Sequence, residues 1–415
     1  MKVYLETYGC TANKSDESIA VGILKKEHHE IVDEMEDADV LTLLTCTVIG
    51  TTEQRMLSRM RAFKKTNKKI IVAGCMPQVQ AELIKSVVPN ASLLSPRYIQ
   101  YIDYIVRGEE LPSQKEKKNI LPKCFKAISA PISIAKGCMF SCSYCITHFA
   151  RGKLQSFTKE EIISDVKQAI NQGCKEMLLT AQDTASYGID TDNDLGCILK
   201  HVCEVEGEFR IRVGMMNPYT AQNNIDSILS AYNHKKIYKF LHLPVQSGDN
   251  SILKQMNRKY QVEDFEKIVS TFRKKYPNIT LSTDIIVGFP GETEERFERS
   301  ERLIKKVKPD IVNITKFSAR PLTQAKTMKQ RIPTEIVKDR SRRLTRLCKE
   351  ASKQINSKHI GKKYILLITK KEDDAVIGRA ENYKPVIVHE EIKVGEFVSV
   401  KIVASEEVHL VGKLI

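Results

Sequence analysis

Signals for strands and helices alternate along most of this 415-residue chain, and the alternation constrains the fold more than any other feature. Short apolar runs rich in β-branched residues are followed by longer segments with helical spacing of apolar residues. Such an order places parallel strands side by side, with helices on their faces. We therefore expect an α/β protein whose reactive residues lie at the carboxyl ends of its strands.

The first 107 residues are expected to form a parallel-sheet α/β domain. Strands are predicted at 3–8, 40–46 and 69–73, and helices at 16–27, 52–65 and 78–86. Residues 108–126 are polar, contain two prolines and lack an apolar period, so we interpret them as a linker.

A central domain is expected at residues 127–355. Its predicted strands are 130–135, 176–180, 209–213, 239–243, 279–287 and 310–317, separated by helices such as 159–171 and 262–275. Six such units predict a partial (β/α)6 barrel. The segment 340–355 has the apolar spacing of a helix, and residues 356–415 contain five short strand signals that predict a small β-barrel.

The formal net charge of +15 favours a polyanionic partner. Seven basic and no acidic residues lie between Gln54 and Lys69, and ten basic and three acidic residues lie between Lys329 and Lys358. Either patch alone could be a solvated helix face, but two patches of this strength point to nucleic acid. Residues 357–415, with ten basic and nine acidic side chains, are nearly neutral.

We expect no signal or membrane segment in this sequence. The longest charge-free run of the first hundred residues, Val40 to Thr52, has 13 residues, which is too short to cross a bilayer as a helix. We expect a cytoplasmic protein with no membrane partner. Because cytosolic thiols stay reduced, eleven cysteines indicate metal or redox chemistry rather than a disulfide framework.

Three cysteines, Cys138, Cys142 and Cys145, follow the first predicted strand of the central domain in the sequence GCMFSCSYC. Thiolates at this spacing on one loop can hold three irons of a cubane cluster and leave the fourth iron open to a small molecule. The alternative is a zinc knuckle completed by His148, three residues after Cys145.

A second set, Cys10, Cys46 and Cys75, is spread over the N-terminal domain. Each lies at or just past the end of a predicted strand, and these ends share one edge of a parallel sheet. Gly9 and Gly74 would let the backbone turn tightly beside two of them. We expect a second three-cysteine cluster, although each thiol could instead be a buried apolar group. The remaining cysteines fit no ligand pattern and are interpreted as structural: Cys124, Cys174, Cys197, Cys203 and Cys348.

The GCMFSCSYC loop resembles the cluster-binding signature of the radical S-adenosylmethionine (SAM) superfamily, whose core is a partial barrel of six units. With its second cysteine set, the chain resembles the methylthiotransferase family along nearly its whole length. The last sixty residues resemble that family's RNA-binding TRAM module. Further matching motifs are TAQDTASYG (180–188), RVGMMNP (212–218), HLPVQSGD (242–249), MNRKY (256–260), TDIIVGFPGET (283–293) and KFSARP (316–321).

The forms RVGMMNP and TAQDTASYG are most similar to the archaeal and eukaryotic branch of the family. That branch converts N6-threonylcarbamoyladenosine at position 37 of tRNA, next to the anticodon, to its 2-methylthio derivative. The resemblance implies two [4Fe–4S] clusters, one on each cysteine set, with SAM as cofactor. The loop cluster would reduce SAM to a radical, and the other would hold the methylated sulfur. An electron-donating reductase and a sulfur donor are implied partners beside tRNA.

Eight residues near predicted strand ends are candidate contacts for SAM. Polar residues would bind its methionine and ribose portions, a glycine-containing turn would lie along the adenine, and a tyrosine of the cluster loop would cover it. Each has an alternative role as a turn, cap or packing residue. The candidates are Gln182, Asp183, Gln246, Ser247, Gly288, Phe289, Pro290 and Tyr144.

Phosphate contacts are expected from the two basic segments, while the TRAM-like module would add shape and local contacts. The candidate RNA-binding residues are Arg55, Arg59, Arg61, Arg340, Arg342, Arg343 and Arg346.

Three positions depart from the family pattern, with Leu44 for Asn, His148 for Lys and Leu322 for Gly. None is a cluster ligand, so the activity prediction stands, but substrate placement around Arg320 is less defined.

The alternative functions are methylthiolation of isopentenyladenosine in tRNA or of a ribosomal-protein aspartate, a non-catalytic zinc protein that binds RNA, and an iron–sulfur electron carrier. The basic charge argues against a protein substrate, and a carrier does not require a six-unit barrel.

Overall fold

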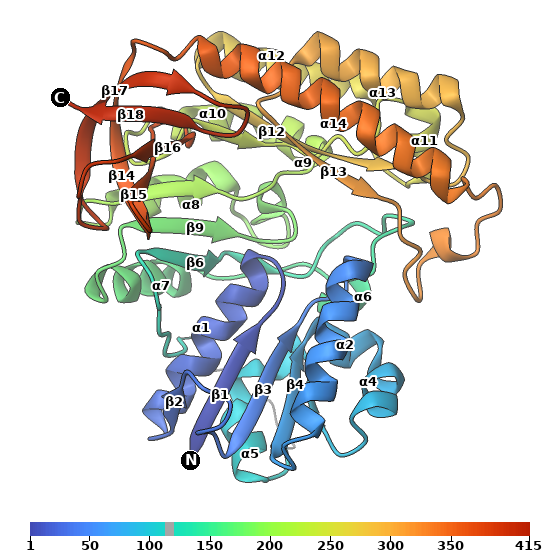
Figure 1. Cartoon of the computed structure of the whole chain (residues 1–415), viewed down its shortest axis with the longest axis vertical. Helices are drawn as coiled ribbons and strands as arrows, with labels where there is room; N and C mark the ends of the chain where they lie inside the picture. Colours follow the sequence, from blue (N-terminus) through green and yellow to red (C-terminus); the bar gives the residue numbers. More distant parts are fainter. Residues whose placement is uncertain (113–119) are drawn as a thin grey trace.

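The computed structural model describes residues 1–112 and 120–415. Figure 1 shows an N-terminal sheet domain, a central open barrel and a small C-terminal barrel. The predicted linker, 108–126, lies partly outside the described residues. Its last part is not a loose connection, because Lys123 is buried and forms an ion pair with Asp165. The Cys124 N–H also donates to the Ser18 carbonyl at 2.9 Å, which ties this segment to the N-terminal domain.

Five parallel strands form the N-terminal sheet in the order β2-β1-β3-β4-β5. Their bounds are β1 Lys2–Thr7, β2 Glu30–Val32, β3 Val40–Thr45, β4 Lys69–Gly74 and β5 Ser92–Leu94. The strands β2 and β5 have three residues each, too few for a periodic signal in the sequence. The strand order reverses between β1 and β3, and such a switch point is where open α/β sheets bind ligands.

Helices cover both faces of this sheet. One face packs against α1 (Thr11–Lys26) and α5 (Ile102–Arg107), and the other against α2 (Gly50–Lys64), α3 (Cys75–Val79) and α4 (Ala81–Val87). With a helix layer on each side, every residue of β3 is buried. The helix predicted at 16–27 begins five residues earlier, directly after Cys10.

Six parallel strands form the central domain, as predicted, in the two sheets β6-β9-β10 and β11-β12-β13. A parallel bridge between Ile211 and Ile237 joins the two sheets into one open barrel. The strand bounds are β6 Ser129–Ser133, β9 Glu176–Thr180, β10 Arg210–Val213, β11 Phe240–His242, β12 Thr280–Val287 and β13 Ile311–Lys316. The short strands β7 (Ala135–Lys136) and β8 (Gln155–Ser156) pair beside it.

Amphipathic helices surround this barrel, with their apolar residues in one large core. Capping residues begin several of them, such as Thr158 before α7 and Thr293 before α13. The helices are α6 Thr147–Arg151, α7 Lys159–Asn171, α8 Leu195–Glu204, α9 Pro218–Asn223, α10 Ile225–Ala231, α11 Asn250–Gln255, α12 Val262–Lys275, α13 Glu294–Val307 and α14 Thr334–Ser357.

The carboxyl ends of the N-terminal strands point toward the central barrel (Figure 1). Helix α1 packs against β6, and α3 packs against α6. The loops that follow β1, β3 and β4 therefore lie beside the loops that follow the first barrel strands. No helix of the described residues is long and apolar enough to cross a membrane.

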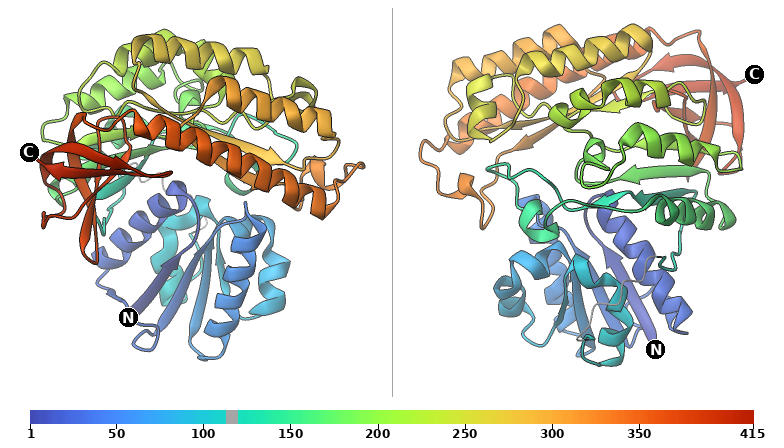
Figure 2. Two further views of the ribbon diagram at one scale, coloured as in Figure 1. Left: turned by 45° about the horizontal axis from the view of Figure 1, so that its top comes forward. Right: turned by 180° about the vertical axis from the view of Figure 1, so that it is seen from behind.

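The C-terminal strands close into a small barrel in the order β14-β15-β16-β18-β17, as predicted. They are β14 Lys363–Glu372, β15 Ala375–Arg379, β16 Pro385–Val388, β17 Phe397–Ser405 and β18 Leu410–Leu414. This barrel sits at the amino ends of the central strands, since Lys384 Nζ donates to Asp310 Oδ1 at 2.6 Å, one residue before β13. The long helix α14 connects it to the opposite edge (Figure 2).

Candidate functional site

The N-terminal cysteines come together at the switch point of the first sheet. Cys10 precedes α1, Cys46 follows β3, and Cys75 is the first residue of α3. Cys46 and Cys75 are buried, whereas Cys10 is exposed. Burial raises the pKa of Cys75 to about 12, and the neighbouring Cys10 and Cys46 contribute to the rise. The three loops thus gather three thiols that a soft metal could deprotonate.

Two glycines permit this convergence. Gly9 has φ of +128° and Gly74 has φ of +89°, in the region that glycine adopts without strain. A Cβ at Gly9 would lie 2.7 Å from Asn13 Nδ2, and one at Gly74 would lie 2.5 Å from the Thr45 carbonyl oxygen. Both the backbone conformation and the available space therefore require glycine beside Cys10 and Cys75.

The amide of Asn13 links all three cysteine loops. Its Nδ2 donates to the carbonyl oxygens of Tyr8 and Thr45, each at 2.8 Å, two residues before Cys10 and one before Cys46. Its Oδ1 accepts from the Cys75 thiol at 3.8 Å. Asn13 is fully buried, and its bonds to Thr45 and Cys75 are shielded from water. Asn13 was not identified from the sequence, because its partners lie on three separate loops.

Arg151 connects this first trio to the loop of the second. It lies in α6, six residues after Cys145, and its Nη2 donates to Asn13 Oδ1 and Asp16 Oδ2, each at 2.7 Å. The side chains of Arg151 and Asp16 are each 4% exposed. Burial alone would lower the Arg151 pKa, but Asp16 and the nearby Cys75 and Cys10 outweigh it and raise the pKa. This buried cation joins the two domains.

The second trio lies on one loop that contacts several elements. Cys138 N–H donates to the Gly152 carbonyl at 3.0 Å, and Cys145 N–H donates to the Cys142 carbonyl at 3.0 Å. Ser143, between the cysteines, donates through Oγ to the Gln255 carbonyl at 2.8 Å, at the end of α11. The cysteine loop is therefore held against the far side of the barrel.

Arg258 supplies positive charge to this loop. Its Nη1 donates to Cys142 Sγ at 3.4 Å, and its Nε donates to Tyr260 Oη at 3.0 Å. Arg258 and Tyr260 belong to the motif at 256–260. The motif by itself did not indicate that Arg258 faces a cysteine. A guanidinium beside a thiolate stabilises the charged sulfur that an iron–sulfur cluster needs.

The donor sets fit cubane clusters with one open corner. Each trio consists of three thiols. Among the described residues, no three His, Cys, Asp or Glu side chains are grouped as they would be around a single ion. A cubane spreads its ligands over separate irons, so its thiolates stand farther apart than those around one zinc ion. Within the described residues, His148 is accordingly not grouped with these thiols as a fourth zinc ligand would be.

The polar SAM candidates divide into two kinds. Asp183 Oδ1 accepts from the Ala185 and Asn217 N–H groups at 3.1 and 2.9 Å, and its Oδ2 accepts from Thr220 Oγ1 at 2.7 Å. Ser247 Oγ accepts from the Asp249 N–H at 3.2 Å. These two residues hold turns, as their alternative interpretation predicts, and burial raises the pKa of Asp183 to about 6.

Gln182 and Gln246 have freer side chains. Gln182 Oε1 is buried just beyond β9 and has no hydrogen-bond partner among the described residues, so this acceptor is available to a ligand. Gln246 is half-buried and has φ of +71° where its backbone pairs with Ile285. A left-handed conformation at a non-glycine residue is often found at functional sites.

The adenine candidates form a packed turn. Gly288 has φ of +79°, and its N–H donates to Glu292 Oε2 at 2.8 Å. The Phe289 ring is fully buried between Tyr144 and Phe317, with ring centroids at 6.4 and 5.3 Å, and Pro290 is also buried. Tyr144 is therefore a packing partner of Phe289, and contact of either ring with adenine stays a prediction.

Three of the predicted RNA-binding arginines are instead engaged within the protein. Arg340 is buried, and its Nη1 donates to Glu292 Oε2 at 3.0 Å. Arg343 forms ion pairs with Glu294 and Glu301, and Arg59 Nε donates to Glu6 Oε2 at 2.5 Å. The prediction is wrong for Arg340, because a count of basic residues does not show which of them face carboxylates. The exposed candidates are Arg55, Arg61, Arg342 and Arg346.

Arg320 also connects the two large domains. Its guanidinium pairs with Glu53 of α2 and donates to Gln80 Oε1 at 3.3 Å. Two residues later, Leu322 has φ of +63° and is 60% exposed. The family's glycine at this position would adopt that conformation without strain. This left-handed backbone conformation gives a physical reason why the family pattern has glycine at the position where this chain has Leu322.

Three segments match described families. Residues 2–95 match the Uncharacterized protein family UPF0004, residues 132–304 the Radical SAM superfamily and residues 358–415 the TRAM domain. A probable threonylcarbamoyladenosine tRNA methylthiotransferase of Pyrococcus horikoshii is 43% identical over the whole of both chains. The Homo sapiens enzyme of that name is 33% identical over 93% of this chain and 69% of its own. This chain belongs to the threonylcarbamoyladenosine tRNA methylthiotransferase family.

Membership of this family confirms the prediction that the protein is a radical SAM enzyme that acts on tRNA. The two cysteine trios fit the expected cofactor set of two [4Fe–4S] clusters and SAM. Among solved structures, the radical SAM methyltransferase TsrM from Kitasatospora setae has a TM-score of 0.56 at 12% identity, covering 78% of this chain and 76% of its own. At that identity the likeness concerns the fold alone. It supports the predicted α/β architecture with a partial barrel.

Proposed function

We propose that this protein converts N6-threonylcarbamoyladenosine at position 37 of tRNA to its 2-methylthio derivative. The observation that carries the proposal is the pair of thiol trios, joined by Arg151, in a chain that aligns along its full length with methylthiotransferases of that name. One trio lies at a sheet edge and the other on a barrel loop. The cluster ligands in this proposal are Cys10, Cys46 and Cys75 at the sheet edge, and Cys138, Cys142 and Cys145 on the barrel loop.

The C2–H bond of an adenine cannot usefully be removed by a side-chain base. When bound, the clusters and SAM supply the radical and sulfur chemistry that the side chains lack. The protein's own residues hold and shield this site. Arg258 stabilises charge beside Cys142, Asn13 holds the first three loops together, and Arg151 sets the first trio against the second. We assign Gln182, whose buried oxygen has no partner in the described part of the chain, to binding of SAM.

The chemistry also requires an electron source and a sulfur source. A one-electron reductase is the class of protein that would deliver electrons, and a sulfide or persulfide donor would replace the sulfur that leaves with each product. Both partners, and a cytoplasmic location, belong to the proposal.

The test uses tRNA that carries N6-threonylcarbamoyladenosine. Anaerobically reconstituted enzyme, SAM and a chemical reductant should add a methylthio group to this nucleoside, detected by nucleoside mass spectrometry. The same tRNA without the threonylcarbamoyl group, isopentenyladenosine tRNA and ribosomal protein serve as comparison substrates. Modification of one of these in place of the proposed substrate would overturn the proposal. Deletion of the gene should remove the methylthio nucleoside from cellular tRNA.

A further inference from the structure

The long helix α14 has two differently charged faces. On one face, Arg340 and Arg343 form ion pairs with glutamates that lie in α13 or in the turn before it. On the other, Lys338, Arg342 and Lys349 follow one another at helical spacing, with Arg346 beside them. Arg340 and Arg343 face three glutamate carboxylates, of which Glu292 is buried, whereas Arg342 and Arg346 have no ion pair within the described protein.

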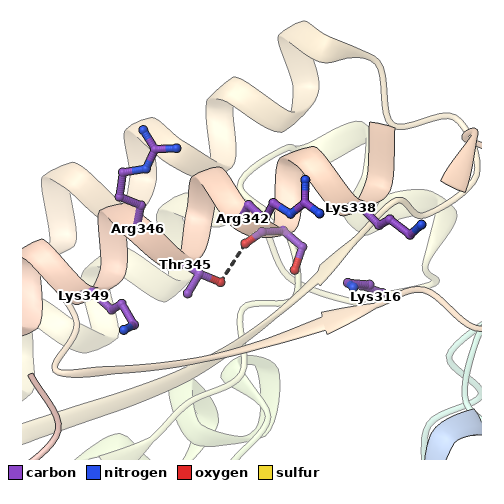
Figure 3. A pocket seen from close by; sticks show the side chains of 7 residues that line it. Lys316, Lys338, Arg342, Thr345, Arg346 and Lys349 are labelled. Carbon is purple, nitrogen blue, oxygen red and sulfur yellow. Dashed lines mark hydrogen bonds between the residues drawn. The ribbon is translucent and has the colours of Figure 1, made fainter. Parts of the chain in front are cut away.

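The second face lines a groove of about 500 Å³. Lys316, at the end of β13, also lines it and lies below Lys338 and Arg342 of the helix (Figure 3). The other lining residues are Ser341 and Thr345, so the groove holds five cations and no carboxylate. Among the described residues, no ion pair or hydrogen bond engages the charged groups of Lys316, Arg342 or Arg346. Lys338 and Lys349 pair with Glu335 and Glu407, whose side chains are 81% and 43% exposed.

The groove links two functional regions of the protein. At one end, Lys349 pairs with Glu407, in the turn between β17 and β18 of the TRAM barrel. At the other, Lys316 ends β13 at the carboxyl edge of the central barrel. Eleven residues of helix between Lys338 and Lys349 correspond to about 16 Å. Cations spread over such a length fit a chain of phosphates better than one isolated anion.

We propose that the groove of Lys316, Lys338, Arg342, Arg346 and Lys349 binds the sugar–phosphate backbone of the tRNA and guides it from the TRAM barrel to the thiol trios. The inference rests on the proposed function, which makes tRNA the substrate. The nearly neutral TRAM barrel cannot supply the phosphate attraction alone. A flat lipid surface could not enter a groove between a helix and a strand, whereas a phosphate backbone can.

The test compares two double variants that each remove two exposed positive charges. Arg342→Gln with Arg346→Gln changes the groove, and Arg302→Gln with Lys306→Gln changes the exposed surface of α13. At about 0.1 M salt, the groove variant should bind tRNA about tenfold more weakly, and its salt slope should fall by about 1.4 to 1.8. The α13 variant should change affinity by less than about twofold. Equal affinity and equal slope in the groove variant and the unaltered protein would overturn the proposal.

Further measurements separate the groove from the proposed function. If the unaltered protein neither binds nor methylthiolates tRNA, the proposed function fails. If it does both and the groove variant binds equally well, only the groove assignment fails. Selective loss of binding to phosphatidylserine vesicles, with tRNA binding intact, would also overturn it. Circular dichroism checks the fold, and if the double variant is unfolded, Lys316→Gln at the strand end replaces it, with a slope decrease of about 0.7 to 0.9 expected.

Discussion

The two cysteine trios reach comparable chemistry by different routes. Cys138, Cys142 and Cys145 lie on one loop, so eight residues of sequence bring them together. Cys10, Cys46 and Cys75 come from three loops separated by tens of residues, and a five-stranded sheet brings them together. The trio on the barrel loop depends on local spacing. The N-terminal trio depends on the register of β1, β3 and β4 and on the amide of Asn13.

This difference predicts how each trio responds to damage. A loop with its ligands in one segment should retain its cluster when the other domain is disturbed. A trio assembled from three loops should lose its cluster when a single tertiary contact is removed. Arg151 is informative because it belongs to the chain segment of the second trio but contacts the surroundings of the first.

The largest expected effect separates SAM cleavage from methylthio transfer. Cys138→Ala should abolish both SAM cleavage and methylthio transfer, whereas Cys75→Ala should abolish transfer but keep SAM cleavage. Each variant should lower the iron content from about eight to about four per chain, since one [4Fe–4S] cluster is lost. Iron analysis and quantification of 5′-deoxyadenosine measure the two outcomes. Loss of SAM cleavage in a stably folded Cys75→Ala protein would show that the trios do not act separately.

The next largest effect concerns Arg151. In Arg151→Ala, the buried Asp16 loses its cation, which should cost about 3 kcal/mol of stability. Urea unfolding of the protein measures the loss, and iron analysis should show depletion of the first cluster before the second. The matched control is Arg302→Ala, whose ion pair with Glu298 is exposed and should contribute less than about 1 kcal/mol. Equal unfolding midpoints for the two variants would contradict a connecting role of Arg151.

Asn13→Ala should have a smaller and more selective effect. It leaves the carbonyl oxygens of Tyr8 and Thr45 without their donor, and because only the bond to Thr45 is buried the total cost should be about 1 to 2 kcal/mol. The first cluster should be lost or become labile, while the electron paramagnetic resonance signal of the loop cluster should persist. Asn250→Ala, which removes amide bonds near the surface, serves as control. Equal weakening of both clusters would show that Asn13 does not serve the first trio specifically.

The smallest effect is expected at the cysteines outside both trios. Cys348 lies half-buried on α14, far along the chain from either set. Cys348→Ala should leave the iron content at about eight per chain and change stability by no more than about 1 kcal/mol. A fall in iron content would mean that the ligand sets are wrongly assigned.

Sequence reasoning predicted the candidate site unevenly, for physical reasons. Strand ends in a parallel sheet share an edge, so Cys10, Cys46 and Cys75 could be expected to meet. The short strands β2 and β5 carry too few residues for a periodic pattern. Arg340 could not be recognised as buried, because its partner Glu292 lies 48 residues earlier in the chain. The same limitation applies to Arg59 and Glu6, 53 residues apart.

The amino-acid sequence by itself determined the three-part architecture, the two sets of three thiols and the family. These features depend on local periodicity and short motifs, which neighbouring residues encode directly. Only the tertiary structure decided that Asn13 and Arg151 join the two trios, which basic residues are neutralised, and that the C-terminal barrel sits at the amino ends of the central strands. Each of these depends on which distant side chains share a buried space, and packing rather than spacing sets that choice.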